Sequence, residues 1–213
     1  CPHLSCIGLT NRQILDLVTH YQQQGINRLV VLRGDAPSGL IGLGECRYAV
    51  DLVRLIREHF GDHFNIAVAA YPEAHPDSKN LSTEVDLFAQ KMQAGADFAI
   101  TQYFYNNDSY FHFMELCEKH QIDKPVIPGI MPIHNFNSLK KFSRQCGAEI
   151  PRWIRKRLEA WGEDLDSIRA LEKRVERTSQ WTHQALPDVD TKGLNLEVSH
   201  KEPEEYTRCM YDL

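Results

Sequence analysis

The stretch RLVVLRGD at residues 28–35 decides the fold class of this chain. The apolar residues 29–32, two of which are β-branched, predict a strand that is buried on both faces. Arg33 and Asp35 then place a guanidinium and a carboxylate where the strand ends, and an irregular loop is predicted before a helix near Tyr48. In α/β proteins this end of a strand is where ligands bind. The alternative is an adhesion-like Arg-Gly-Asp or a chance surface turn, which the buried-type residues before it disfavour.

The composition is that of an ordinary globular domain and excludes several classes of function. The 213 residues are enough for one domain with a sizeable core, and 42% of them are hydrophobic and 25% charged. A net charge of −5 gives no positive field that would attract nucleic acid or a membrane surface. No apolar run of about 18 residues could span a membrane, and residues 1–6 lack the pattern of a signal peptide. Because the chain does not start with Met, we expect further residues before Cys1.

Six cysteines are scattered along the chain without a Cys-x-x-C pair. Scattered cysteines are by default reduced thiols of a cytoplasmic protein, so we predict a cytoplasmic location. No His and Cys residues lie at the spacing of zinc ligands, and the sequence therefore predicts no metal site.

The chain repeats a unit of one strand followed by one helix. Apolar strand candidates begin near His3, Arg28, Asn65, Phe98 and Val126. These starts lie 25 to 37 residues apart, which is the length of a βα unit. Five consecutive units predict a parallel sheet, in either a doubly wound fold or a (β/α)8 TIM barrel.

Residues that favour helix starts lie between the strand candidates. Thr10 and Gln13 form a capping-box pattern, and Ser82 is a candidate cap for the third helix. Further helices are predicted to start at Asn107 or Asp108 and at Asn135 or Asn137.

Polar side chains follow several of the strands, namely Asp35, Tyr71 and Gln102. Functional groups from the ends of many strands favour a barrel over a fold with one switch point. No Gly-x-Gly-x-x-Gly motif follows a strand, so the usual dinucleotide fingerprint is absent. We therefore predict an α/β fold of the (β/α)8 TIM-barrel type over residues 1–175, followed by an atypical, poorly ordered polar tail over residues 176–213.

Three residue types stand out as candidates for ligand binding. Tyr71 and His75 lie on a loop framed by prolines and could grip a polar cofactor, although a rigid surface turn has the same pattern. Gln102 is out of place in a buried strand unless its amide meets a ligand or partner. His3 in the first strand is either a ligand contact or a satisfied core histidine.

Five segments together resemble one known family. They are PHLSC at 2–6, LRGD at 32–35, AAYPEAHP at 69–76, AGADFAITQYFY at 94–105 and IPGIMPI at 127–133. In this order they resemble the bacterial-type methylenetetrahydrofolate reductases, which are flavin-dependent (β/α)8 barrels, over about residues 1–170. The resemblance implies an oxidoreductase with FAD that passes a hydride from NADH or NADPH to 5,10-methylenetetrahydrofolate. The product, 5-methyltetrahydrofolate, feeds methionine synthesis.

The resemblance also implies roles for individual residues. Asp35 matches the carboxylate beside flavin and folate, Gln102 the amide that contacts pterin and nicotinamide, and Phe142 the aromatic ring on the bound substrate. These three are the expected catalytic and substrate-binding residues. The positions that match FAD contacts are His3, Leu32, Arg33, Gly34, Asp35, Tyr48, Ala49, Tyr71, His75 and Lys91.

The sequence also departs from the family pattern. The family's general-acid glutamate and its first two strands would precede Cys1, and its last strand is not recognisable after residue 170. Ser138 stands where many bacterial members have glutamine. Since a barrel needs about 250 residues, we expect an incomplete barrel that binds flavin and folate weakly and turns over poorly.

The expected ligands are the folate and the nicotinamide dinucleotide, and association of the chain with copies of itself is left open. One alternative is an inactive barrel fragment that only binds flavin or a partner chain through its open sheet edges. Another is an aldolase-like or phosphate-binding barrel, which is disfavoured because no strand ends in lysine.

Overall fold

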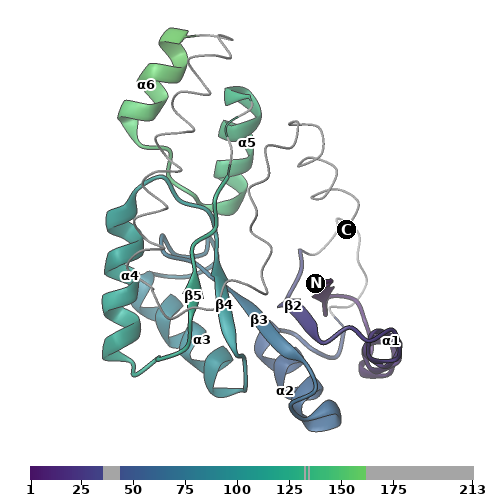
Figure 1. The fold of residues 1–213 in the computed structure, drawn as a ribbon. Helices are drawn as coiled ribbons and strands as arrows, with labels where there is room; N and C mark the ends of the chain where they lie inside the picture. The colour runs from purple at the N-terminus through teal and green to yellow at the C-terminus, as the bar shows by residue number, and fades with distance from the viewer. Residues whose placement is uncertain (36–43, 132, 134, 162–213) are drawn as a thin grey trace.

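The computed structural model describes residues 1–35, 44–131, 133 and 135–161 (Figure 1). Five parallel strands form one sheet and lie in the order in which they occur in the sequence. The strands are β1 (His3–Ser5), β2 (Arg28–Leu32), β3 (Asn65–Ala70), β4 (Phe98–Thr101) and β5 (Val126–Ile127). The predicted alternation of strand and helix is therefore confirmed over these residues, including the buried strand after Arg28.

Six helices belong to the described part of the chain. They are α1 (Asn11–Gln23), α2 (Ala49–Phe60), α3 (Leu81–Gln93), α4 (Asn107–Lys119), α5 (Phe136–Cys146) and α6 (Arg152–Trp161). No helix in this part is long and apolar enough to cross a membrane. Residues 162–175 of the predicted barrel and the predicted tail at 176–213 lie outside the described residues.

The polar caps explain where the helices begin. Thr10 and Gln13 form the predicted capping box of α1, and the Asn135 side chain accepts a hydrogen bond from the Ser138 backbone to start α5. The cap predicted at Ser82 is wrong, because the Asn80 side chain already accepts from the Thr83 amide and α3 begins two residues earlier. Asparagine and serine are about equally good caps, so the local sequence does not decide between Asn80 and Ser82.

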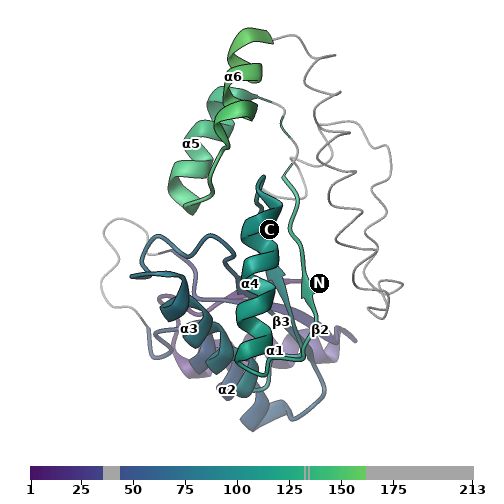
Figure 2. The same ribbon diagram turned by 90° about the vertical axis from the view of Figure 1, so that its left-hand side faces the viewer.

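The main core lies between the sheet and α1–α4. A row of matched residues, Leu4, Val31, Val68, Ala99 and Val126, runs across all five strands, and each of them is at most 1% exposed. Their side chains pack against apolar residues from all four helices, which follow one face of the sheet (Figures 1 and 2). The other face carries a smaller cluster made by Val30, Ala67, Phe98 and Ile127. Residues that alternate along a strand point to opposite faces, so both faces are apolar.

α5 and α6 pack into a separate apolar cluster beyond the ends of the strands (Figure 2). Tyr103 and Tyr105, which follow β4, contribute to it together with Leu139 of α5 and with Ile154 and Leu158 of α6. This arrangement brings α5 close to the carboxyl ends of the strands, where the candidate residues were predicted.

Arg57 of α2 links the amino ends of β3 and β4, on the side of the sheet away from the candidate residues. Its guanidinium donates to Asp97 Oδ2 at 2.6 Å, to the Gly95 carbonyl at 2.8 Å and to the Phe64 carbonyl at 2.8 Å. Asp97 Oδ2 also accepts from the Ile66 amide at 2.6 Å. The amino ends of β3 and β4 are thus fixed by charged hydrogen bonds, which leaves the carboxyl ends free to carry a site.

Candidate functional site

The predicted Arg-Gly-Asp turn follows β2 and is held close to β1. Ser5 Oγ donates to the Arg33 carbonyl at 2.9 Å, and the Ile7 amide donates to the same oxygen at 3.0 Å. Gly34 has φ +82° at this point, and a Cβ there would collide with Ser5 Oγ and lie 2.9 Å from Ile7 Cγ2. Only glycine fits such a close approach with a left-handed backbone. The position of Asp35 is therefore set by the backbone just before it.

Arg33, Asp77 and His75 form a network across two strand ends. Arg33 Nη2 lies 3.1 Å from Asp77 Oδ2, and His75 Nδ1 lies 3.8 Å from the same oxygen. The Asp77 amide donates to His75 Nδ1 at 3.1 Å, which fixes the orientation of the imidazole. Arg33 and His75 were predicted as site residues, whereas Asp77 was missed because nothing in the local sequence marks it.

Tyr71 and Lys91 lie next to this network. The rings of Tyr71 and His75 meet edge to face with centroids 4.8 Å apart, and Lys91 Nζ lies 5.8 Å from the Tyr71 ring centroid. Lys91 Nζ donates to the Ala69 carbonyl at 2.6 Å. Burial lowers the pKa of Lys91 to about 8, against the attraction of Glu84. Together, Arg33, Tyr71, His75, Asp77 and Lys91 form what we call the Tyr71 cluster.

Glu84 of α3 holds the loop that carries His75 of the Tyr71 cluster, and it was not predicted as a site residue. It is 3% exposed, its Oε2 accepts a hydrogen bond from the Ser78 hydroxyl, and the His75 amide donates to the same oxygen at 3.4 Å. Glu84 lies four residues before Phe88 on the buried face of the helix, which is a sequence pattern that could have marked it. A buried carboxylate in that place anchors the loop that carries His75.

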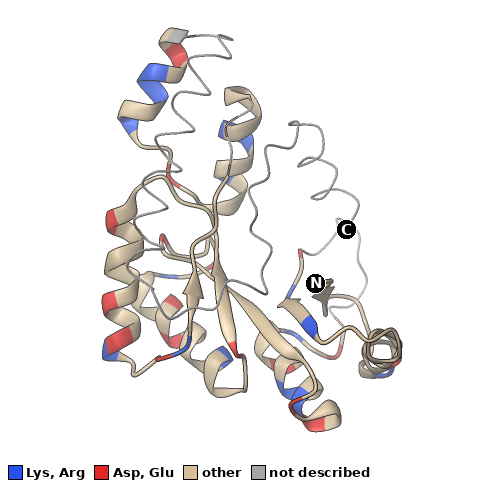
Figure 3. Ribbon diagram, in the orientation of Figure 1, with Lys and Arg blue, Asp and Glu red and all other residues tan. Residues whose placement is uncertain are grey.

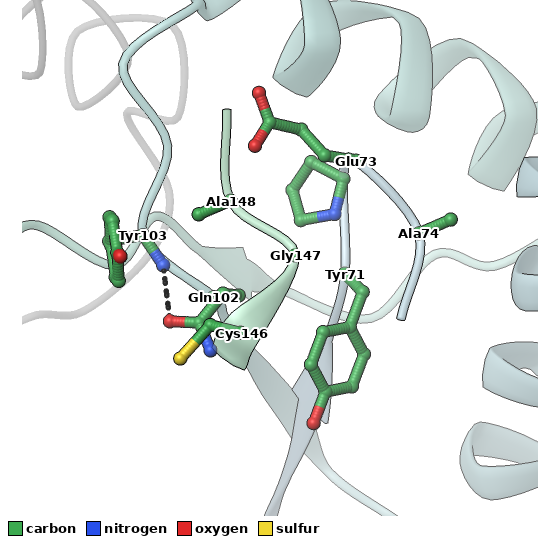
Figure 4. A pocket seen from close by; sticks show the side chains of 9 residues that line it. Tyr71, Glu73, Ala74, Gln102, Tyr103, Cys146, Gly147 and Ala148 are labelled. Atoms are coloured by element: carbon green, nitrogen blue, oxygen red, sulfur yellow. Dashed lines mark hydrogen bonds between the residues drawn. The ribbon is translucent and has the colours of Figure 1, made fainter. Parts of the chain in front are cut away.

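Gln102 lies beside a small, open pocket whose enclosed space would hold about one water molecule (Figure 4). The backbone amide of Gln102 donates to the Ala70 carbonyl at 2.7 Å, which extends the pairing of β3 and β4. The side-chain oxygen Oε1 accepts from the Tyr103 backbone amide at 3.0 Å. The pocket is lined by Tyr71, Pro72, Glu73, Ala74, Gln102, Tyr103, Cys146, Gly147 and Ala148. The structure therefore brings the predicted Gln102 and Tyr71 to the same space.

Phe142 of α5 stacks on Tyr103, and Tyr103 lines the pocket. The two rings are stacked with centroids 5.8 Å apart and planes at 14°, and Tyr103 Oη lies 2.9 Å from Ser143 Oγ. Tyr103 is 4% exposed whereas Phe142 is 38% exposed, so Phe142 presents its free face to solvent. An exposed aromatic face held on a buried ring is suited to stacking with a flat heterocycle.

The charge of Asp35 acts on both sides of the pocket. It adds to the effect of burial and of Glu84 in raising the pKa of Tyr71 to about 12, while Arg33 opposes it. It also adds to the burial that raises the pKa of the Cys146 thiol. Asp35 is therefore within electrostatic reach of both Tyr71 and the end of α5.

The remaining predicted residues are not joined to this region. His3 lies in β1, where burial and the amino terminus lower its pKa, and Leu32 ends β2. Tyr48 is 59% exposed and precedes Ala49, the first residue of α2. Among the described residues, no hydrogen bond, ion pair or ring contact links His3, Tyr48 or Ala49 to the Tyr71 cluster.

The helices beside the pocket are strongly basic (Figure 3). Residues 135–161 carry seven basic side chains against two acidic ones, although the whole chain has a net charge of −5. The basic residues are Lys140, Lys141, Arg144, Arg152, Arg155, Lys156 and Arg157. This local positive field favours anionic ligands near the pocket.

Sequence comparisons agree with the resemblance in the five segments. The model of the family described as "Methylenetetrahydrofolate reductase" matches residues 1–202. The 5,10-methylenetetrahydrofolate reductase of Buchnera aphidicola subsp. Schizaphis graminum is 40% identical over 170 residues, which cover 80% of this chain and 57% of that protein. That of Escherichia coli K12 is 40% identical over 166 residues, covering 78% and 55%. The chain thus spans little more than half the length of these curated relatives.

A solved structure has the same arrangement of strands and helices. It superposes with a TM-score of 0.58 at 20% identity and covers 84% of this chain and 60% of that one. It is described as "Uncharacterized protein from Clostridium thermocellum binds two copies of 5-methyl-5,6,7,8-tetrahydrofolic acid". At this identity the likeness supports the fold alone. Because the family model matches almost the entire chain, the protein belongs to the methylenetetrahydrofolate reductase family.

Proposed function

We propose that this chain carries the flavin and folate site of a reductase that converts 5,10-methylenetetrahydrofolate to 5-methyltetrahydrofolate. FAD is the proposed resident cofactor, NADH or NADPH the reductant, and methionine synthesis the use of the product. The observation that carries the proposal is that Asp35, Tyr71 and Gln102 follow three neighbouring strands, that Tyr71 and Gln102 line one pocket, and that the charge of Asp35 reaches Tyr71. The family relation supports it, and so does the folate bound by the solved neighbour.

The proposed architecture is a (β/α)8 barrel. In the described residues the strand order follows the sequence without reversal, and α1–α4 cover a single face of the sheet. A doubly wound sheet would place helices on both faces and reverse its order at a switch point. Both features therefore support the barrel.

The side chains around Tyr71 fit an anionic flavin cofactor. Tyr71 and His75, whose rings meet edge to face, offer an aromatic wall. The Arg33–Asp77 ion pair is exposed, so it is worth only about 0–1 kcal/mol and leaves the guanidinium available to a pyrophosphate. Lys91 is a buried cation with a lowered pKa, which a bound anion would restore. When bound, FAD would supply the hydride for the reduction.

The chain's own residues would then position and stabilise the folate. The carboxylate of Asp35 would favour the cationic iminium form of the opened substrate by placing a fixed negative charge beside it. Gln102 would both donate to and accept from the pterin or the nicotinamide amide. The exposed face of Phe142 would stack on the substrate and exclude water from one side of it.

We place this activity in the cytoplasm. The five cysteines within the described residues, Cys1, Cys6, Cys46, Cys117 and Cys146, are all free thiols. Free thiols are typical of a reducing compartment.

The test is flavin binding and turnover by the purified chain. The protein is mixed with FAD, freed of unbound flavin and examined for a bound-flavin spectrum, and NAD(P)H-dependent reduction of the folate is then assayed. We expect Asp35→Asn to slow folate reduction about 100-fold and flavin reduction by the dinucleotide far less. Asp62→Asn, an exposed carboxylate after α2, is the control. Equal slowing of both half-reactions would remove Asp35 from its role, and bound flavin without turnover would favour the non-catalytic alternative.

A further inference from the structure

Glu73 joins two parts of the chain that are 76 residues apart. It lies in the loop between β3 and α3, and its Oε2 accepts a hydrogen bond from the Glu149 backbone amide at 2.8 Å. Its other oxygen, Oε1, is buried and accepts no hydrogen bond of good geometry among the described residues, although the Ser109 hydroxyl lies close enough to the carboxylate to lower its pKa. Figure 4 shows the side chain directed toward the segment after Gly147, on the rim of the pocket. Burying a carboxylate oxygen without a good partner costs free energy, so a carboxylate at this position is expected to serve a role other than stability.

A second contact reinforces the first. Gly147 ends α5 with φ +74°, and a Cβ at this position would lie 2.9 Å from Pro76 Cγ. The end of α5 thus touches the β3–α3 loop at Glu73 and again at Pro76. A side chain at residue 147 would push the two apart.

The loop and α5 differ in how firmly they are held elsewhere. The loop has its own anchors, because Glu84 binds Ser78 and His75 and because Arg33 pairs with Asp77. α5 belongs to the smaller apolar cluster, and beyond that cluster Tyr103 holds it through Phe142 and Ser143. Loss of the Glu73 contact should therefore loosen α5 and leave the loop in place.

We propose that Glu73 is a positioning residue that holds the segment after α5 against the β3–α3 loop and so fixes Phe142, which stacks on Tyr103, relative to the pocket that Gln102 lines. The inference rests on the proposed function in one respect: the ligand that would contact Phe142 and Gln102 is taken to be a reduced folate. Glu73 itself touches no reacting atom. It acts through the backbone of Glu149, and the expected consequence is an effect on folate affinity with little effect on flavin affinity.

Glutamine is the conservative replacement that separates position from charge. Burial and the neighbouring Glu149 carboxylate raise the pKa of Glu73, whereas the Glu149 amide and Ser109 lower it. A glutamine keeps an oxygen that can accept from the Glu149 amide and fills the same volume. Alanine removes the acceptor. Glu118→Ala, at an exposed carboxylate on α4, is the matched control.

The experiment measures hydrogen exchange and ligand affinity in the whole chain. For Glu73→Ala we expect the Glu149 amide to exchange about tenfold faster, while exchange in residues 71–78 stays as in the wild type. The Kd for 5-methyltetrahydrofolate should rise about fivefold and that for FAD by less than about twofold. Glu73→Gln should restore both values, and Glu118→Ala should change neither.

Each contrary outcome has a definite meaning. Unchanged exchange at Glu149 in Glu73→Ala would overturn the proposed contact, and equal weakening of folate and FAD would reduce Glu73 to a general structural role. If the wild type binds FAD but no folate, the proposed function and the folate step both fail, and the exchange result still decides whether Glu73 holds α5. Should Glu73→Ala not fold, Gly147→Ala disturbs the same junction from the other side and must give the same exchange and affinity pattern.

Discussion

Replacing Lys91 by methionine should change how the stability of the ligand-free protein depends on pH. Lys91 projects from α3 toward Tyr71, and its ammonium group is buried with a pKa of about 8 in place of 10.5. Because the folded state binds this proton less tightly than the unfolded state, the charged form opposes folding at low pH. Methionine has a similar length and no charge, so it removes this penalty.

The size of the effect follows from the shift in pKa. Below pH 8 the penalty is complete, at about 3 kcal/mol for a shift of this size, and it fades as the pH rises toward the unfolded pKa. The variant also loses the hydrogen bond to the Ala69 carbonyl, which lowers its gain in stability by about 1 kcal/mol. The shift in pKa already includes the attraction of Glu84, so the net gain at pH 7 should be about 2 kcal/mol. Between pH 7 and pH 9.5 the stability difference between variant and wild type should shrink by about 2 kcal/mol.

The assay is urea unfolding of wild type and variant at both pH values, followed by circular dichroism. Tyrosines and thiols of the unfolded state also titrate near pH 9.5, but this contribution is common to both proteins and cancels in the difference. Lys119→Met, at an exposed lysine on α4, should show no such pH dependence. A stability difference that stays constant within about 0.5 kcal/mol over this range would refute the reasoning. If Lys91 also binds the proposed cofactor, the same variant should lose FAD affinity while the free protein becomes more stable at pH 7.

Two further substitutions test the supports of the site. Gly34→Ala should lower the free energy of unfolding by about 2–4 kcal/mol, because a side chain at φ +82° is strained and its Cβ collides with Ser5; a loss below about 1 kcal/mol in urea unfolding would contradict this. Arg57→Met should cost about 3 kcal/mol, because it removes the guanidinium from Asp97 and from the Gly95 carbonyl. That variant should still have the native spectrum of any bound flavin, since the bonds lie at the opposite ends of the strands, and a changed spectrum would count against this separation.

Local sequence was sufficient for the parts of the molecule that short-range chemistry determines. The run of apolar residues before Arg33 could only be a buried strand, and the capping box at Thr10 fixed the first helix. The start of α3 was misplaced because Ser82 and Asn80 are both acceptable caps. The choice between them depends on how the loop after Asp77 packs before the helix begins. Such a choice is made by tertiary packing, which the local pattern does not contain.

The candidate site shows the same division. Asp35, Tyr71 and Gln102 could be found because each follows a strand, and parallel strands bring their carboxyl ends to one edge whatever the intervening sequence. Prediction along the sequence failed for partners that meet through loops, such as Asp77 with Arg33.

The Glu73 contact shows why those missed partners matter for function. A strand end can place a side chain at the edge of the sheet, but it cannot set the distance to a segment that follows 76 residues later. That distance depends on a single acceptor oxygen at Glu73 and on the bare backbone of Gly147 against Pro76. Under the proposed function, the strands therefore place the ligand site and these loop contacts set how closely Phe142 can approach it. Substitutions in the loops should accordingly alter affinity for the folate while the fold and the flavin-binding residues stay as they are.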